Sequence, residues 1–334
     1  MITAYMNTQS IYTSFEINEM KWVKKGLIFT PDDRFEWNQK GYASVPTVYK
    51  ITDDRLRIYY TARDGNNRTN ISFIEVDAEA PEKILYVHND SVLIHGKMGM
   101  YDDCGAMVSH VIEVGNEVWM YYIGWNVRNT IAYHNSIGLA ISKDGGITFE
   151  KFSEGPLFDR NYKEPYFSAA PFVLNENGIW KMWYLSNTAW VEYNGKSEPF
   201  YHIKYAESDN GIDWKREGKV AIDYKNENEC GIVRSCVLKD DETYKMWYSY
   251  RNLQDYRENK NNSYRIGYAE SFNGIDWIRM DDKVGIDVSE CGWDSEMIEY
   301  PFVYDHNGKR YMIYNGNTFG GSGFGYAVLE VKDV

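Results

Sequence analysis

The sequence contains five copies of one phrase, and this repetition constrains the fold more than any other feature. Each copy has an apolar stretch, a polar turn and a second apolar stretch that ends in tyrosine. The closing tyrosines are Tyr60, Tyr122, Tyr184, Tyr248 and Tyr314, so the copies follow one another at intervals of 62 to 66 residues. A fixed period of short apolar stretches is typical of propellers, in which each repeat forms one sheet.

Each copy continues into a third apolar stretch, and copies two to four add a fourth stretch after a glycine-containing turn such as Asn210-Gly211 or Asn273-Gly274. Turns of this kind between short alternating stretches indicate antiparallel hairpins, and no 3.6-residue periodicity competes with them. We therefore expect an all-β, five-bladed propeller with four antiparallel strands per blade, formed by residues 1–334 as a single domain. The expected blades are approximately 35–95, 96–158, 159–223, 224–285 and 286–334.

The last copy ends without a fourth strand, and the N-terminal region contains a segment that could supply it. Residues 21–28, Lys-Trp-Val-Lys-Lys-Gly-Leu-Ile, resemble residues 213–220, which follow the third strand of copy three. We expect residues 20–30 to complete the fifth blade and to close the ring, because radial closure removes exposed sheet edges.

Composition and charge narrow the range of partners. The net charge is −13 and the isoelectric point is near 5.0, which disfavours nucleic acid and anionic membranes as ligands. The sequence has no signal-peptide pattern at its start and no apolar run of about 18 residues, so we expect a cytoplasmic protein without membrane insertion. The four cysteines lack metal-site spacing, and no motif calls for a cofactor, so we expect neither a metal nor a cofactor.

The polar residues of the repeats concentrate where functional groups would meet. In a propeller, the loops that enter strand one and leave strand two share one face, so their residues converge on a central funnel. The candidate acids are Asp103, Glu164, Glu229, Asp294 and Glu299. The other candidates are Arg63, Arg234 and Arg251 for an anionic group, Trp125 and Asn187 for a sugar, and His110. Paired carboxylates can catalyse cleavage of a glycosidic bond, and arginine can bind a carboxylate or phosphate group of a ligand. Each acid has the alternative of capping a turn, and His110 has the alternative of a place in the core.

Two phrases of the repeats resemble a known group of proteins. Second strands such as Met246-Trp247-Tyr248-Ser249 and third strands such as 267–271 resemble the five-bladed glycosidases of families 32, 43, 62, 68 and 130. Residues 292–297 and 311–317 resemble a glycosidase-like subgroup associated with surface-polysaccharide synthesis.

The resemblance implies roles for two positions. Glu299-Tyr300-Pro301 is similar to the phrase that holds the general acid in the furanosidase families, which would make Glu299 the proton donor. Those families place a base or nucleophile aspartate before a proline in the first blade, where this chain has Val45. Asp103, Glu164 or Glu229 would then supply the second carboxylate.

We therefore predict a carbohydrate-active, glycosidase-like enzyme that cleaves the glycosidic bond of an anionic or furanosidic sugar by carboxylate acid/base catalysis. Two alternatives remain open. The funnel could transfer a sugar, with a sugar nucleotide as donor, during surface-polysaccharide synthesis. Alternatively, the propeller binds a carbohydrate without catalysis.

Overall fold

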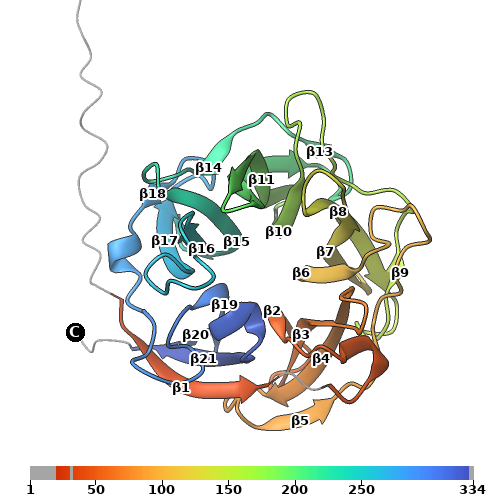
Figure 1. Cartoon of the computed structure of the whole chain (residues 1–334). Coiled ribbons are helices and arrows are strands. Elements are labelled where there is room, and N and C mark those ends of the chain that lie inside the picture. Colours follow the sequence, from red (N-terminus) through yellow and green to blue (C-terminus); the bar gives the residue numbers. More distant parts are fainter. Residues whose placement is uncertain (1–19, 31–32, 331–334) are drawn as a thin grey trace, which may run out of the picture.

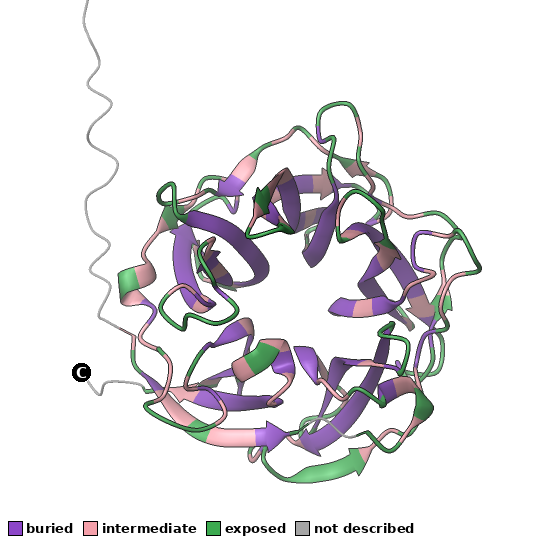
Figure 2. Cartoon of the chain, viewed as in Figure 1, coloured by how far each residue is buried: buried purple, intermediate pink, exposed green. Residues whose placement is uncertain are grey.

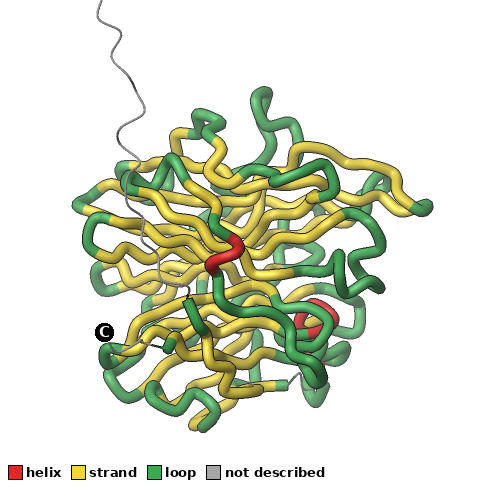
Figure 3. Tube along the Cα trace, turned by 90° about the vertical axis from the view of Figure 1, so that its left-hand side faces the viewer, coloured by secondary structure: helices red, strands yellow, loops and turns green. Residues whose placement is uncertain are grey.

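The computed structural model of the chain describes residues 20–30 and 33–330, which form strands and loops around a common centre (Figure 1). Helix is confined to short segments, as the side view in Figure 3 shows. These are the 3-10 turns η1 (Glu36–Asn38) and η2 (Asp281–Lys283) and the short helix α1 (Asn317–Gly320). The predicted all-β class is therefore confirmed, and the arrangement is that of a propeller.

The first two repeats each form a four-stranded antiparallel sheet. The first sheet contains β2 (Ser44–Lys50), β3 (Arg55–Arg63), β4 (Thr69–Asp77) and β5 (Ile84–Val87). The second contains β6 (Ala106–Val114), β7 (Glu117–Val127), β8 (Tyr133–Ser142) and β9 (Glu150–Lys151).

The third and fourth repeats are joined in one sheet of nine strands. Repeat three supplies β10 (Ser168–Glu176), β11 (Ile179–Tyr193), β12 (Lys196–Ser208), β13 (Trp214–Lys215) and β14 (Val220–Ile222). Repeat four supplies β15 (Glu229–Asp240), β16 (Thr243–Asn252), β17 (Arg265–Ser271) and β18 (Ile278–Arg279). A single parallel pairing, Tyr201 with Gly231, links the two antiparallel meanders. The described residues thus form four hydrogen-bonded sheets instead of five separate ones.

The last sheet combines both ends of the described chain. It contains β19 (Glu299–His306), β20 (Lys309–Asn315), β21 (Phe324–Leu329) and, as its outer strand, β1 (Trp22–Phe29). β1 runs antiparallel to β21, and Trp22 lies opposite Leu329. This is the pairing that the similarity between residues 21–28 and 213–220 predicts. Trp22, Ile28 and Phe29 are buried against the largest apolar core.

The innermost strands β2, β10, β15 and β19 share an unusual backbone feature. Val45, Ala170, Arg234 and Tyr300 have left-handed φ values of 57°, 46°, 60° and 54°. At each of these positions the register with the neighbouring strand shifts, as in a β-bulge. Left-handed backbone is costly for residues other than glycine, so a bulge repeated in four strands points to a structural or functional demand at the centre. Figure 2 shows that these innermost strands are largely buried.

Candidate functional site

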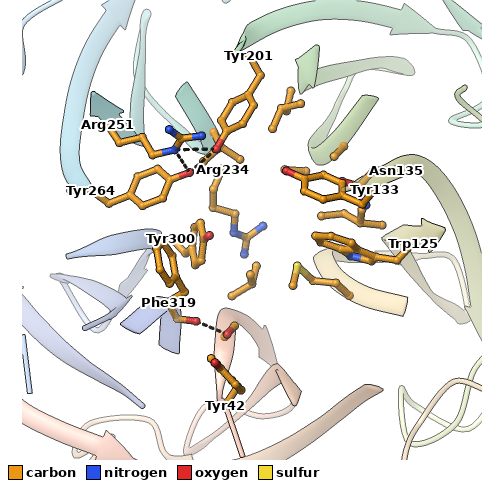
Figure 4. A pocket seen from close by; sticks show the side chains of 18 of the residues that line it. Tyr42, Trp125, Tyr133, Asn135, Tyr201, Arg234, Arg251, Tyr264, Tyr300 and Phe319 are labelled. Atoms are coloured by element: carbon orange, nitrogen blue, oxygen red, sulfur yellow. Dashed lines mark hydrogen bonds between the residues drawn. The ribbon is translucent and has the colours of Figure 1, made fainter. Parts of the chain in front are cut away.

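The centre of the ring holds a cavity of about 400 Å³, whose walls come from all five repeats (Figure 4). The four left-handed bulge residues of the inner strands all line it. The ends of second strands and the starts of third strands complete the wall, as the convergence of these segments predicts. A cavity of this size lies within the range of small-molecule sites.

One wall of the cavity is aromatic and comes from the second and third repeats. The rings of Trp125 and Tyr133 are 4.7 Å apart, and those of Tyr133 and Phe167 are 5.5 Å apart. Asn135 lies beside them, and the indole Nε1 of Trp125 is buried without a hydrogen-bond partner. Flat rings beside unused donors can take up the apolar face and the hydroxyls of a sugar.

The opposite side and the floor are cationic. Arg63, Arg234, Arg251 and Arg257 line the cavity, whereas no aspartate or glutamate among the described residues does. The Arg257 guanidinium is paired with the carboxylate of Glu198. The other three have no carboxylate partner in residues 20–30 and 33–330, which is notable in a chain of net charge −13. Buried charges are costly without a counter-charge, so the cavity favours an anion.

Arg251 is held by phenols instead of by acids. Its Nε donates to the hydroxyls of Tyr201 and Tyr264 at 3.2 Å each, and these hydroxyls are 2.5 Å from each other. The guanidinium also lies 3.7 Å from the centre of the Tyr256 ring. All three phenols line the cavity, and Arg251 itself is only 2% exposed. Neutral partners fix the position of the guanidinium and leave its charge uncompensated.

Arg234 forms the floor. From its bulge on β15, its guanidinium donates to the carbonyls of Ser109 and Pro46 and, at 2.8 Å, to the Thr47 hydroxyl, so it connects β15 with β6 and β2. Its Nε has no partner. Burial lowers the pKa of Arg234 to about 10, so the group stays charged at neutral pH.

His110 lies behind this floor and outside the cavity lining. Its ring packs 4.1 Å from that of Phe172, and burial lowers the pKa of His110 to about 3. The backbone N–H of Val173 donates to its Nδ1. These contacts match the alternative reading of His110 as a core histidine.

Two of the five candidate acids, Glu164 and Asp294, lie in another repeated arrangement, away from the cavity lining. In repeats two to five the hydroxyl of the closing tyrosine donates to an acid that is also paired with a base. The sets are Tyr122–Asp102–Lys151, Tyr184–Glu164–Lys204, Tyr248–Asp281–Arg279 and Tyr314–Asp294–Lys24. Glu164 and Asp294 belong to these sets, and Glu229 is bound by the same Arg279. These carboxylates therefore tie loops and strands together within single repeats.

Asp103 and Asn187 also lie outside the cavity lining. Hydrogen bonds from Gly99, Cys104 and Asn126 outweigh the effect of burial and lower the pKa of Asp103, which stabilises the loop before β6. Asn187 is buried, and neither atom of its amide has a partner.

Glu299 is the one candidate acid without a structural partner. It is fully buried, and neither carboxyl oxygen makes a hydrogen bond. Burial raises the pKa of Glu299 well above its usual range, against smaller opposite effects of Tyr300 and Arg251. The residues at its position in repeats one, three and four, Ser44, Ala169 and Val233, line the cavity, whereas in repeat five Tyr300 lines it and Glu299 does not.

The raised pKa of Glu299 makes stability depend on pH. The native state keeps the proton above the ordinary pKa of 4.5, whereas the unfolded state releases it. The contribution of Glu299 to the free energy of unfolding therefore falls by about 1.4 kcal/mol per pH unit from about pH 5 upward, until the pH reaches the pKa of Glu299 in the native state. We expect Glu299→Gln to remove this slope, so the variant should gain stability relative to the wild type as the pH rises above about 5.

Urea unfolding at several pH values measures this difference, and Glu290→Gln, at an exposed site, is the control that should follow the wild type. Parallel stability curves for the wild type and Glu299→Gln would contradict a protonated Glu299.

Several residues that line the cavity were not among the site residues predicted from the sequence. Tyr201 and Tyr264 occupy the same position one repeat apart, two residues before Ile203 and Ile266 respectively, and that spacing is the signal that could have found them. Phe319 lies in α1, where Thr318 and Phe319 are both left-handed, and its ring packs edge-on against those of Tyr256 and Tyr264. No local pattern predicts that turn.

Comparison with known proteins identifies relatives along nearly the whole chain. The uncharacterized proteins MT1551 and Rv1502 of Mycobacterium tuberculosis (strains CDC 1551 and H37Rv) are each 38% identical over 311 residues, which cover 93% of this chain and 100% of the relative. The chain belongs to their family. No protein-family model matches the sequence of this MT1551-family member.

Solved structures share the fold at low sequence identity. A glycoside hydrolase has a TM-score of 0.69 at 17% identity, with 95% of this chain and 93% of that chain covered. A thermostable family-43 glycoside hydrolase has a TM-score of 0.62 at 18% identity, with 91% and 94% covered. An exo-1,5-α-L-arabinanase from a bovine ruminal metagenomic library has a TM-score of 0.58 at 14% identity, with 89% and 95% covered. The MT1551-family chain thus has the propeller fold of glycosidases.

In the part of the chain that the structure describes, no helix is long and apolar enough to cross a bilayer. The same residues contain no cluster of three or more histidine, cysteine or acidic side chains that could bind a metal ion.

Proposed function

We propose that this protein binds the anionic part of a carbohydrate in its central cavity. The observation that carries the proposal is that three arginines, Arg63, Arg234 and Arg251, line the cavity and have no carboxylate partner among the described residues. A carboxylate or phosphate of the ligand would supply the missing charge through charge-assisted hydrogen bonds. The glycosidase-like fold supports a sugar as the remainder of the ligand.

The shape of the cavity supports the same ligand class. The sugar ring would lie against Trp125 and Tyr133, while its anionic group points to Arg251 and Arg234 on the other side. Tyr201 and Tyr264 place their hydroxyls beside Arg251. A neutral sugar would leave the arginines uncompensated and should bind weakly.

Calorimetry with matched sugars tests this proposal. We expect glucuronate, galacturonate or glucose 1-phosphate to bind at least about tenfold more tightly than glucose or galactose, because the neutral sugars make no charge-assisted contact. The preference should shrink as salt is raised. Equal affinity for charged and neutral sugars, or no binding of any anionic sugar, would contradict the proposal.

Glycoside cleavage is a second candidate function, favoured by the raised pKa of Glu299. A carboxyl group that stays protonated can donate to a leaving oxygen, and it would reach the ligand if the Tyr300 wall moved. Glu299→Gln should then abolish turnover and keep ligand binding. Unchanged turnover would exclude the role, and transfer to an acceptor sugar in surface-polysaccharide synthesis would depend on the same residue. Asp103, Glu164 and Glu229 are weaker candidates for the second carboxylate because each is hydrogen-bonded or ion-paired elsewhere.

We also propose that the five sequence repeats are the five blades of one domain, with the third and fourth blades sharing a sheet through Tyr201 and Gly231.

A further inference from the structure

The central cavity is closed on the side of Arg234. The guanidinium of Arg234 connects three inner strands, and the side chains behind it, His110, Phe172 and Phe302, are buried and pack on one another. Because this side is filled, a ligand has to enter from the face that carries the loops between second and third strands. A carbohydrate chain would therefore enter with one end first.

The rim on that face is extended by one hairpin. β11 and β12 are 15 and 13 residues long, and their pairing continues to Tyr193 opposite Lys196. The second strands of the other repeats are 7 to 11 residues long. The hairpin turns at Asn194-Gly195, where both residues are left-handed. The Asn194 amide donates to the carboxylate of Asp255, which ties the tip to the loop that follows β16.

A groove of about 120 Å³ lies between the hairpin tip and that loop. It shares two wall residues, Tyr256 and Arg257, with the central cavity, so the two spaces are adjacent. Arg257 is fixed there by its ion pair with Glu198 and lies 4.2 Å from the centre of the Tyr256 ring. The Tyr256 hydroxyl donates to the same Glu198.

The chemistry of the groove differs from that of the cavity. Its charged residues are of both signs: Lys196 and Arg257 against Glu198, Asp255 and Glu258. Tyr193 and Tyr256 add aromatic surface. Mixed donors and acceptors beside rings suit the hydroxyls and faces of a neutral sugar, whereas the cavity suits an anion.

We propose that the groove under the β11–β12 hairpin, lined by Tyr193, Lys196, Tyr256 and Arg257, binds a neutral sugar unit attached to the anionic unit in the cavity. The ligand is then an oligosaccharide recognised from its anionic end. This inference rests on the proposed function, because it takes the anionic sugar as the occupant of the cavity.

The other face of the hairpin offers a natural control. A second surface pocket lies between residues 190–192 and 195–197 and the loop Arg128–Ala132; it shares Lys196 with the groove but no lining residue with the central cavity. A chain leaving the cavity along the shared Tyr256 wall would not reach this pocket. Changes there test whether any effect of the hairpin is specific to the groove.

Calorimetry with glucuronate and with glucuronic acid glycosidically linked to glucose tests the inference, and the galacturonate pair serves as a second probe. We expect the disaccharide to bind about tenfold more tightly than the monosaccharide, since the second unit adds contacts in the groove. Tyr193→Ala should reduce the disaccharide's advantage to about twofold or less. Thr130→Ala, in the pocket on the other face, should keep the full advantage.

The outcomes separate this inference from the proposed function. Tight binding of glucuronate or galacturonate with no gain for either disaccharide would overturn the groove and leave the anion site standing. If Thr130→Ala lost the tighter binding of the disaccharide and Tyr193→Ala kept it, the second sugar unit would lie on the other face of the hairpin. That result would also overturn the proposed binding in the groove. If neither a uronate nor its disaccharide binds, this inference fails, and the proposed function fails with it when glucose 1-phosphate does not bind either. Melting temperatures of both variants control for misfolding.

Discussion

Trp22→Ala should destabilise the protein by about 3–5 kcal/mol, since it removes a large buried side chain from the strand that joins the two ends of the described chain. Trp22 is 6% exposed and packs edge-on against Trp247, with ring centres 6.2 Å apart. Deletion of residues 1–30 should have a larger effect, because it leaves the backbone groups of β21 unpaired along one edge. Urea unfolding of the single variant and the melting temperature of the truncated chain measure the two effects.

Lys25→Ala is the matched control on the same strand, since Lys25 is exposed and should change the unfolding free energy by less than about 0.5 kcal/mol. A truncated chain with an unchanged melting temperature would show that the ring does not depend on β1.

Arg251→Met should weaken binding of an anionic sugar by about 30-fold to about 1,000-fold. The substitution removes a buried guanidinium whose charge is uncompensated, and truncating such a contact typically costs about 2–4 kcal/mol of binding free energy. Calorimetry with the tightest-binding anionic sugar measures the loss, and a neutral sugar should lose far less.

Arg251 also contacts Tyr201 and Tyr264, so Arg63→Met provides a second test with less risk to the fold. Among the described residues, the Arg63 guanidinium makes only long hydrogen bonds of 3.4 and 3.5 Å, both with Asn67, and it lies 5.4 Å from the centre of the Tyr42 ring. The exposed Arg128→Met is the charge-matched control and should bind as the wild type does. If Arg251→Met and Arg63→Met bound anionic sugars as tightly as the control Arg128→Met, the cavity would not be the anion site.

The arrangement of sheets was accessible from the sequence because each repeat carries its own turns and its own closing tyrosine. The pairing of β1 with β21 was accessible for the same reason, since residues 21–28 repeat a pattern present elsewhere in the chain. The joining of repeats three and four was not accessible, because it depends on one backbone pairing between Tyr201 and Gly231.

The site was predictable in part. Arg63, Trp125 and Arg251 each follow the closing tyrosine of their repeat by three residues and line the cavity, whereas Asn187, at the same position of repeat three, does not. The acids were harder to place, because the same strand-end positions also supply partners for the tyrosine hydroxyls. Glu164 shows why: its partners Tyr184 and Lys204 are 20 and 40 residues away, beyond any local pattern.

The joining of the first and last described strands also shapes how the chain is made. Trp22 and Leu329 are paired although they lie about 300 residues apart in the sequence, so this contact contributes strongly to a high contact order. During synthesis, β1 leaves the ribosome before the other described strands and cannot pair until β21, the last of them, has emerged. The nascent protein therefore carries an unpaired apolar segment throughout its translation. A circularly permuted gene that encodes β1 directly after β21 would let the two strands pair as soon as both are synthesised. We expect it to raise the yield of folded protein.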